Sequence, residues 1–387
     1  MMQHRVSQTW TARVRWRVHT HARRRPAYVF LFFALLWLGF ALPGADGPTV
    51  QAQGTLPPGP VLIYLPIVQA NTGVDLNQSV TFSVEGLDFP NGLAVHRTQR
   101  HLYVTSRETD TLFKLDPSGK ILGQAATGDQ PWGVSVNEST NRVYVSNFGG
   151  QVWVYDAETL ARLAAIDVGP GPGMLAVDPI IDTVAVVVTG AGQIAFIRGL
   201  QLEQTLDAAA GGPFAIAADI RNQHFVVTHR DAGSMGVYYR TDAGWRNDGA
   251  QVAFGDRVTP FGVTVDHRTG RIYALTWHPG DEWFVEVFQK FSQGDVRPGA
   301  KIRVGNSGNK DDPDVGGAGI TVNVNNQHVF VANTRDGTVS VVDGSIDAVV
   351  NTVNVGADPT VVTMNRDTGA VYVGLRQSSQ IFRFRDQ

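Results

Sequence analysis

The sequence predicts an all-β protein, a seven-bladed β-propeller of four-stranded blades that is closed by an N-terminal strand completing the last blade. Three observations lead to this fold class. A unit of roughly 41 residues recurs, and each unit carries two sequence anchors. Glycine is abundant at 42 residues, whereas charged residues make up only 17%. This composition suits many short strands that are joined by tight turns.

The first anchor is a short apolar segment that begins with proline in all units but the sixth. Its starting positions are separated by 41, 41, 41, 47, 57 and 42 residues. The segments are Pro90–Val95, Pro131–Val136, Pro172–Val177, Pro213–Ala218, Pro260–Val265, Gly317–Val322 and Pro359–Met364. A period of this length predicts a repeat architecture rather than several unrelated domains.

The second anchor follows each first anchor at a similar distance and is rich in β-branched and aromatic residues. Its copies are Tyr103–Ser106, Tyr144–Asn147, Ala185–Val188, Phe225–Thr228, Tyr273–Thr276, Phe330–Asn333 and Tyr372–Leu375. Two independent anchors keep nearly the same period through seven copies, so chance does not explain the pattern.

Each unit is predicted to form four strands. In the second unit the expected strands are Gly133–Val136, Arg142–Ser146, Gln151–Tyr155 and Leu163–Val168. The segments between them contain the Asn, Asp and Gly residues that turns require. Four short strands within about 41 residues form one propeller blade.

The two ends of the repeat array predict how the ring closes. The last unit stops after its third strand, at Ile381–Phe384, and lacks a fourth. A lone strand pattern, Val80–Val84, lies just before the first unit. We expect this strand to complete the seventh blade, because such a join hides exposed strand edges. Residues 79–387 are therefore predicted to form one indivisible domain.

The strand sequences resemble those of the YVTN-family β-propellers. The resemblance rests on Tyr103–Ser106 and Tyr144–Asn147, and on the third-strand segments Gln151–Asp156 and Thr338–Asp343. It covers roughly residues 79–387 and departs from the family pattern in the third and fourth units. Members of this family occur in surface-layer and periplasmic proteins, so the resemblance implies a location outside the cytoplasm.

The N-terminal segment 1–52 is predicted to be a signal peptide. Seven arginines lie between Arg5 and Arg25, and the apolar run Tyr28–Leu42 follows. This run is shorter than the about 20 residues of a membrane-spanning helix, and Ala52 ends a plausible cleavage site. An uncleaved membrane anchor is the alternative. Residues 53–78 are expected to form a proline-rich linker.

Charge and cysteine content exclude several classes of function. Removal of residues 1–52 leaves 25 basic and 34 acidic residues, a net charge of about −9. Such an acidic protein is not expected to bind nucleic acid. The chain contains no cysteine, so disulfides, thiolate metal sites and cysteine nucleophiles are all excluded.

One face of the predicted propeller is the expected binding site. Loops that enter the inner strands and loops between second and third strands converge there over the axis. The predicted ligand-binding residues are Arg107, Trp132, Phe148, Phe214, His229, Arg230, Phe261, Trp277, His278, Arg335 and Arg376. Arginines beside aromatic rings suit a small anionic ligand, a glycan or a protein partner. The alternative is that the rings pack the mouth of the tunnel and the arginines are solvated.

A metal site is a further candidate. A long insertion before the sixth blade supplies Asp311, Asp312 and Asp314, whose oxygens are ligands of the kind that Ca²⁺ prefers. Asn91, at the start of the first inner strand, is similar to an asparagine that binds a divalent cation in gluconolactonase-type propellers. The spacing of the three aspartates in the insertion is not that of an EF-hand loop. The alternative is that the insertion is a solvated acidic loop that binds no metal.

Two functional hypotheses follow. The first is an exported binding or scaffold protein, extracellular, at the cell surface or in the periplasm, that acts through its loop face on a protein, glycan or small anionic ligand. It is expected to be a monomer without a cofactor, and to contact a membrane only through an uncleaved leader. The second is a metal-dependent lactonase or esterase. We expect binding rather than catalysis, because no HExxH or GxSxG motif is present.

Overall fold

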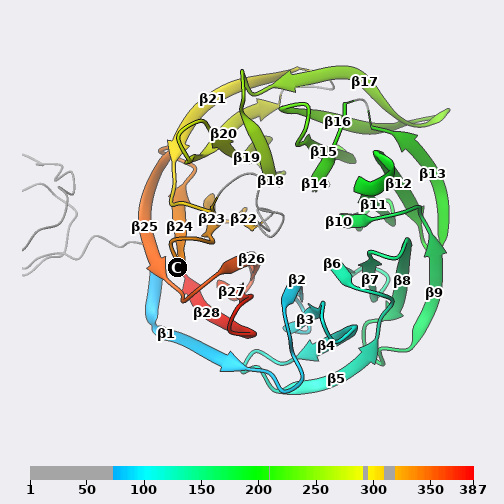
Figure 1. The fold of residues 1–387 in the computed structure, drawn as a ribbon, viewed down its shortest axis with the longest axis vertical. Coiled ribbons are helices and arrows are strands. Elements are labelled where there is room, and N and C mark those ends of the chain that lie inside the picture. Colours follow the sequence, from blue (N-terminus) through cyan, green and yellow to red (C-terminus); the bar gives the residue numbers. More distant parts are fainter. Residues whose placement is uncertain (1–72, 209, 291–294, 309–318) are drawn as a thin grey trace, which may run out of the picture. The chain divides into compact units, whose positions relative to one another are not determined.

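The computed structural model describes residues 73–208, 210–290, 295–308 and 319–387, all of which lie in the compact unit Ile67–Gln387. These residues form seven four-stranded antiparallel sheets arranged in a ring (Figure 1). The predicted fold class, a seven-bladed β-propeller, is therefore confirmed. Within the described residues no helix is long and apolar enough to cross a membrane.

The blades are numbered here in chain order, and the strands of each blade are given from the axis outward. The first four blades contain β2 (Pro90–His96), β3 (His101–Ser106), β4 (Thr111–Leu115) and β5 (Ile121–Ala126); β6 (Pro131–Asn137), β7 (Arg142–Asn147), β8 (Gln151–Asp156) and β9 (Arg162–Asp167); β10 (Pro172–Asp178), β11 (Thr183–Val188), β12 (Gln193–Arg198) and β13 (Gln201–Asp207); β14 (Pro213–Asp219), β15 (His224–His229), β16 (Ser234–Thr241) and β17 (Gly244–Ala253).

The last three blades contain β18 (Thr259–Asp266), β19 (Arg271–His278), β20 (Glu282–Lys290) and β21 (Val296–Arg303); β22 (Ile320–Asn323), β23 (His328–Asn333), β24 (Thr338–Asp343) and β25 (Ala348–Asn354); β26 (Pro359–Asn365), β27 (Ala370–Leu375), β28 (Gln380–Asp386) and β1 (Val74–Ser83). A short 3₁₀ turn, Thr189–Ala191, follows β11. The four strands predicted for the second unit agree with β6 to β9.

The hydrophobic core lies between neighbouring blades. Seven clusters of buried side chains fill the seven junctions, and each cluster draws residues from two adjacent sheets. The second strands are the most buried, and every residue of β11 is buried. Aromatic rings add specific contacts, such as the stack of Phe196 on Trp245 at 4.4 Å between blades 3 and 4. Each blade therefore depends on both of its neighbours for stability.

The ring closes as predicted. β1 pairs antiparallel with β28, the last strand of the chain, with Ser83 opposite Gln380 and Phe82 opposite Ile381. The ring of Phe82 packs against the cluster between blades 7 and 1. It lies so close to Gly119, which has φ 89°, that a side chain there would collide with it. β1 begins at Val74, inside the segment predicted to be linker.

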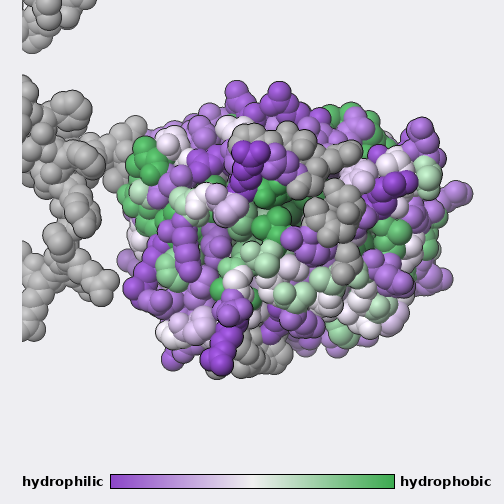
Figure 2. All heavy atoms as spheres, turned by 90° about the horizontal axis from the view of Figure 1, so that it is seen from above, coloured by the Kyte–Doolittle hydropathy of each residue, from purple (hydrophilic) through white to green (hydrophobic). Residues whose placement is uncertain are grey.

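The turns divide the propeller into two faces. The loop face carries the loops that precede the inner strands and those between second and third strands. The opposite face carries the turns between first and second strands and between third and fourth strands. Figure 2 shows the ring from its rim, where hydrophilic residues predominate and hydrophobic residues appear as separate small patches.

Candidate functional site

A repeated backbone hydrogen bond places the loop-face side chains at equivalent positions around the ring. In blades 1, 2, 3, 4 and 7 the residue before the inner-strand proline has a left-handed backbone, with φ 56° at Phe89 and 59° at Asp358. Its carbonyl accepts the N–H of the residue that follows the second strand, at 3.1 Å from Arg107 and 3.0 Å from Arg376. The same bond, from Phe148 to the residue before Pro131, measures 3.2 Å. The residues that follow the second strands of these blades therefore lie at the same level along the propeller axis.

The first cluster on this face is built around Phe89. The guanidinium carbons of Arg107 and Arg376 each lie 5.2 Å from the centre of the Phe89 ring. Arg107 also lies 5.4 Å from the ring centre of Trp132. Cation–π contacts of this kind hold the guanidinium groups in place beside the rings. Blades 7, 1 and 2 thus meet in one arginine and aromatic cluster.

Both arginines of this cluster have polar partners of their own. Arg376 donates two hydrogen bonds to Asp358, from Nε to Oδ2 at 2.6 Å and from Nη2 to Oδ1 at 3.1 Å. Both side chains of this pair are largely buried. Arg107 donates from Nη2 to Oε1 of Gln130 at 3.2 Å. These hydrogen bonds hold the guanidinium groups in place before any ligand binds, so binding a ligand costs less conformational entropy.

The exposed part of the cluster is aromatic. The Phe148 side chain is 50% exposed, although it is large and apolar. Its ring centre lies 6.3 Å from that of Trp132, which is half-buried. An exposed phenylalanine beside tryptophan and arginine has the composition of a binding surface rather than of an ordinary turn.

A second cluster lies on blades 4 and 5. Arg230 is 5.4 Å from the ring centre of Phe214 and 5.1 Å from that of Phe261. The two rings meet edge to face at 5.5 Å, and Phe261 also contacts Trp283 at 4.9 Å. Phe261 is fully buried, so it supports the site from below and does not contact a ligand at the surface. Phe261 therefore agrees with the alternative interpretation, in which the aromatic rings pack the mouth of the tunnel.

His229 differs from the expectation. It ends β15 and is fully buried, because its side chain lies on the face of the strand that packs against blade 3 together with Phe225 and Val227. Burial lowers the pKa of His229 to about 4, so the imidazole is neutral at pH 7. The Tyr238 hydroxyl lies 3.5 Å from its Nε2. This histidine is part of the core.

The buried His229 should make the protein sensitive to acid. Between pH 6.5 and pH 4 the unfolded chain binds a proton here that the folded protein does not bind, so stability falls as the pH drops through this window. The full effect amounts to about 3 kcal/mol. We expect His229→Gln to show a smaller loss between pH 6.5 and pH 4.5 than the wild type, measured by urea unfolding. Equal losses in both proteins would contradict this assignment.

His278 and Trp277 are also occupied within their own blade. His278 is buried, with Nε2 at 2.8 Å from Oε1 of Glu286 and Nδ1 at 3.0 Å from Nζ of Lys301. Burial and the charge of Lys301 lower the pKa of His278. Trp277 is buried and donates from Nε1 to Asp281 at 3.2 Å. Trp277 belongs to the hydrophobic core cluster that contains Phe261 and against which Phe214 packs, so it lies beneath the second cluster as part of the core.

Arg335 follows β23 one residue later than Arg107 and Arg376 follow their strands, because Thr334 occupies the corresponding position. Its N–H donates to the carbonyl of Asn306 at 3.1 Å, and the residue is exposed. It therefore belongs to the loop face but lies outside both clusters. Of the predicted residues, the structure groups Arg107, Trp132, Phe148 and Arg376 in the first cluster, and Arg230, Phe214 and Phe261 in the second.

The axis holds a narrow tunnel of about 190 Å³ that is lined mainly by apolar and small residues of the inner strands, among them Leu93, Met174, Ile216 and Val361. Asn91, near its loop-face end, has a buried Nδ2 atom without a hydrogen-bond partner. The other predicted metal ligands, Asp311, Asp312 and Asp314, lie outside the described residues. Within the described part of the chain no three His, Cys, Asp or Glu residues gather as a metal site.

Sequence reasoning missed three members of the first cluster, namely Phe89, Gln130 and Asp358. All three stand immediately before an inner-strand proline: Pro90, Pro131 and Pro359. This shared position is the sequence signal that could have identified them, because the residue before the inner strand recurs at an equivalent place in successive blades. The partners that these residues contact come from other strands, and no local pattern names them.

Comparison with known proteins supports the fold alone. No family model and no curated protein matches the chain. Hydrazine synthase from Kuenenia stuttgartiensis is similar in structure, with a TM-score of 0.64 and 15% identity, over 79% of this chain and 97% of that one. A functionally unknown protein from Desulfotomaculum acetoxidans has a TM-score of 0.59 and 16% identity, over 69% of this chain and 86% of that one.

Proposed function

We propose that this chain is an exported β-propeller binding protein whose loop face docks a protein partner. The observation that carries the proposal is the first cluster, in which the half-exposed Phe148 lies beside Trp132 while Arg107 and Arg376 are ordered around Phe89. Tryptophan and arginine are the residues that most often anchor protein interfaces. Export is supported by the basic and apolar leader, and by the resemblance of the repeats to YVTN-family propellers of the cell surface and periplasm.

The arrangement favours binding over catalysis. A hydrolase needs a nucleophile, a general base or a metal-bound water at a site where substrate fits. The residues of the first cluster supply rings and guanidinium groups, and their one carboxylate, Asp358, is held by Arg376. The metal-dependent hydrolase alternative rests on Asn91 alone among the described residues.

The proposal is tested by capture on immobilised wild-type protein and two matched variants. Phe148→Ser removes the exposed ring of the loop face, whereas Ile346→Ser removes an even more exposed apolar side chain from a turn of the opposite face. From an envelope extract of the source organism, we expect one partner protein that the wild type and Ile346→Ser retain alike. Phe148→Ser should bind it roughly thirtyfold more weakly, the loss expected for a central aromatic anchor.

Two outcomes contradict the proposal. Equal retention by Phe148→Ser and the wild type would show that the loop-face cluster is not the interface. Capture of no protein, together with turnover of a lactone or ester by the purified chain, would favour the hydrolase instead. Binding of a glycan that Phe148→Ser abolishes would keep the site and replace the class of partner.

A further inference from the structure

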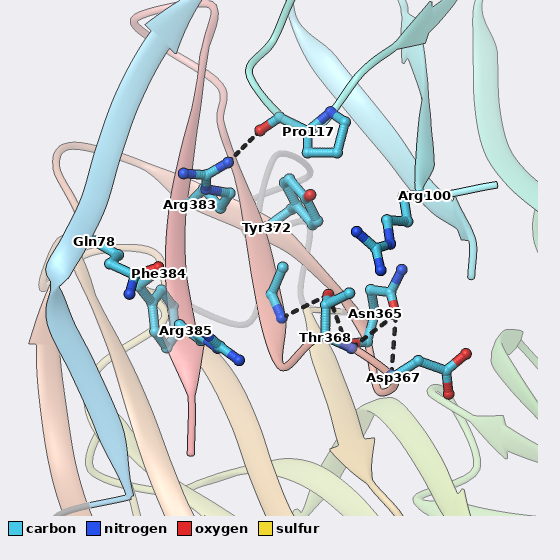
Figure 3. Close-up of a pocket in the computed structure, with 11 residues that line it drawn as sticks. Gln78, Arg100, Pro117, Asn365, Asp367, Thr368, Tyr372, Arg383, Phe384 and Arg385 are labelled. Carbon is cyan, nitrogen blue, oxygen red and sulfur yellow. Dashed lines mark hydrogen bonds between the residues drawn. The ribbon is translucent and has the colours of Figure 1, made fainter. Parts of the chain in front are cut away.

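The junction between blades 7 and 1 contains a pocket on the opposite face, away from the loop-face clusters. Its volume is about 400 Å³, which is within the range of small-molecule sites. Figure 3 shows three arginines around it: Arg100 from the turn between β2 and β3, and Arg383 and Arg385 from β28. The same view places Tyr372 between Arg383 and Arg100. The first and the last blade therefore both contribute side chains to the lining of this pocket.

The pocket exists because the seventh blade begins its second strand with a small residue. Ala370 pairs with Asn365 across β26 and β27, as Arg142 pairs with Asn137 in blade 2. At this position the other blades carry His101, Arg142, Thr183, His224, Arg271 and His328. In blade 7 the space of that larger side chain stays open, beside Arg385 on the paired strand.

The charges of this junction are unbalanced when compared with those of blades 2 and 3. There, Arg142 forms an ion pair with Asp182, the left-handed turn residue of the next blade, at 3.5 Å. The corresponding turn residue at the junction of blades 7 and 1 is Arg100, with φ 58°. Ala370 thus stands in place of Arg142, and Arg100 stands in place of Asp182.

A second pair shows the same loss of an acid. In blade 1, Lys114 faces Tyr103 and contacts the Glu158 carboxylate of the next blade at 3.0 Å. Arg383 faces Tyr372 in the same way, but Ser118 stands where Glu158 would be. Arg383 instead donates to the carbonyl of Pro117. Arg383 also forms a side-chain hydrogen bond with Tyr372. A guanidinium group has five N–H donors, so these two bonds leave others for a ligand.

The remaining charges do not neutralise the three arginines. Asp367, at the rim, is half-exposed and lies 3.5 Å from Arg97, which already pairs with Glu138. Asp116 accepts hydrogen bonds from Ser118 and Lys120 within its own turn. The side chains of Arg100 and Arg385 are exposed, and neither forms an ion pair with the described residues.

We infer that this pocket binds a small phosphorylated ligand of about monosaccharide size, whose oxyanion takes the place of the missing Asp182 and Glu158 counterparts. Planar guanidinium groups bind phosphate oxygens through paired hydrogen bonds, and several arginines around one anion reinforce each other. The volume exceeds that of a bare phosphate, and Gln78 supplies a polar group along the wall for hydroxyls. Asn365 and Thr368 also line the wall, but their side chains hold the turn between β26 and β27. The site is independent of the function proposed for the loop face.

Calorimetric titration of the purified chain with glucose 6-phosphate, inorganic phosphate and glucose tests this inference. We expect saturable binding of glucose 6-phosphate, weaker binding of inorganic phosphate and none of glucose, with affinity falling as salt is added. Arg385→Ala and Arg100→Asn should each weaken binding about tenfold, because each removes one charged donor group. Asparagine tolerates the left-handed backbone of residue 100, so the turn is retained.

Two further variants sharpen the result. Arg246→Ala removes an exposed arginine of β17, on the far side of the ring in Figure 1, and should leave the affinity unchanged. The double variant Ala370→Arg with Arg100→Asp rebuilds the ion pair of blades 2 and 3, and should abolish binding while the thermal midpoint is kept or raised. Equal affinities for Arg385→Ala, Arg100→Asn and Arg246→Ala, or no binding of either phosphate probe by the folded wild type, would overturn the inference.

Discussion

Removal of the closing strand β1 is expected to abolish cooperative folding of the propeller. Without residues 1–83, the edge of β28 loses its partner and the cluster of blades 7 and 1 loses Phe82. Several backbone hydrogen bonds at about 1 kcal/mol each, with one partly buried phenylalanine, sum to most of the stability of an ordinary domain. Urea unfolding followed by tryptophan fluorescence should show a low or broad transition. A truncated chain that unfolds with the midpoint and slope of the full chain would contradict this view.

A disulfide between β1 and β28 should instead stabilise the closure of the ring. The chain has no cysteine, so Ser83→Cys with Gln380→Cys can form only one disulfide. These positions are 297 residues apart in sequence, and closing so long a loop restricts the unfolded chain by on the order of 5 kcal/mol. The oxidised variant should unfold at higher urea than its reduced form, which serves as the matched control.

Lys290→Met should cost about 3 to 5 kcal/mol, because it leaves a buried carboxylate without its cation. Nζ of Lys290 lies 2.9 Å from Oδ2 of Asp219, and both side chains are almost fully buried between blades 4 and 5. Burial opposes the charge of Asp219, but hydrogen bonds from Asn222 and Lys290 outweigh it and hold the pKa of Asp219 below its ordinary value. Lys290 also contacts His224.

The sign of the pH dependence distinguishes this mechanism from simple loss of packing. Without Lys290 the pKa of Asp219 should rise above its unfolded value, so the deficit of the variant against the wild type should shrink as the pH falls and Asp219 binds a proton. Urea unfolding of Lys290→Met should therefore show a smaller deficit against wild type at pH 4.5 than at pH 7. Adding Asp219→Asn should recover much of the loss at pH 7. An unchanged deficit at both pH values would assign the effect to packing.

Much of the fold follows from local sequence signals. The proline-led inner strands and the aromatic second strands recur with one period, and turn residues between them set the strand lengths. The missing fourth strand of the last unit and the lone strand before the first predicted the pairing of β1 with β28. These features depend on residues a few positions apart, so periodicity and turn chemistry reveal them.

The functional surface was only partly predictable. Arg107, Phe148 and Arg376 were expected on the loop face because each follows a second strand. That Phe89 lies between Arg107 and Arg376 was not foreseen, nor that His229 is buried. Successive side chains of a strand point alternately to the two neighbouring blades. Whether the last one is buried therefore depends on the register of the strand within its blade, which the repeat alone does not give.

The sequence by itself determined the number of blades, their strands, the closing strand and the loops that share a face, because each of these depends on local patterns. Only the tertiary structure decided which charges meet across a junction. Arg100 and Arg385 stand at opposite ends of the repeat array and line one pocket because the ring closes there. An imbalance of charge between the first and last blades therefore becomes visible only when the two ends of the propeller are brought together.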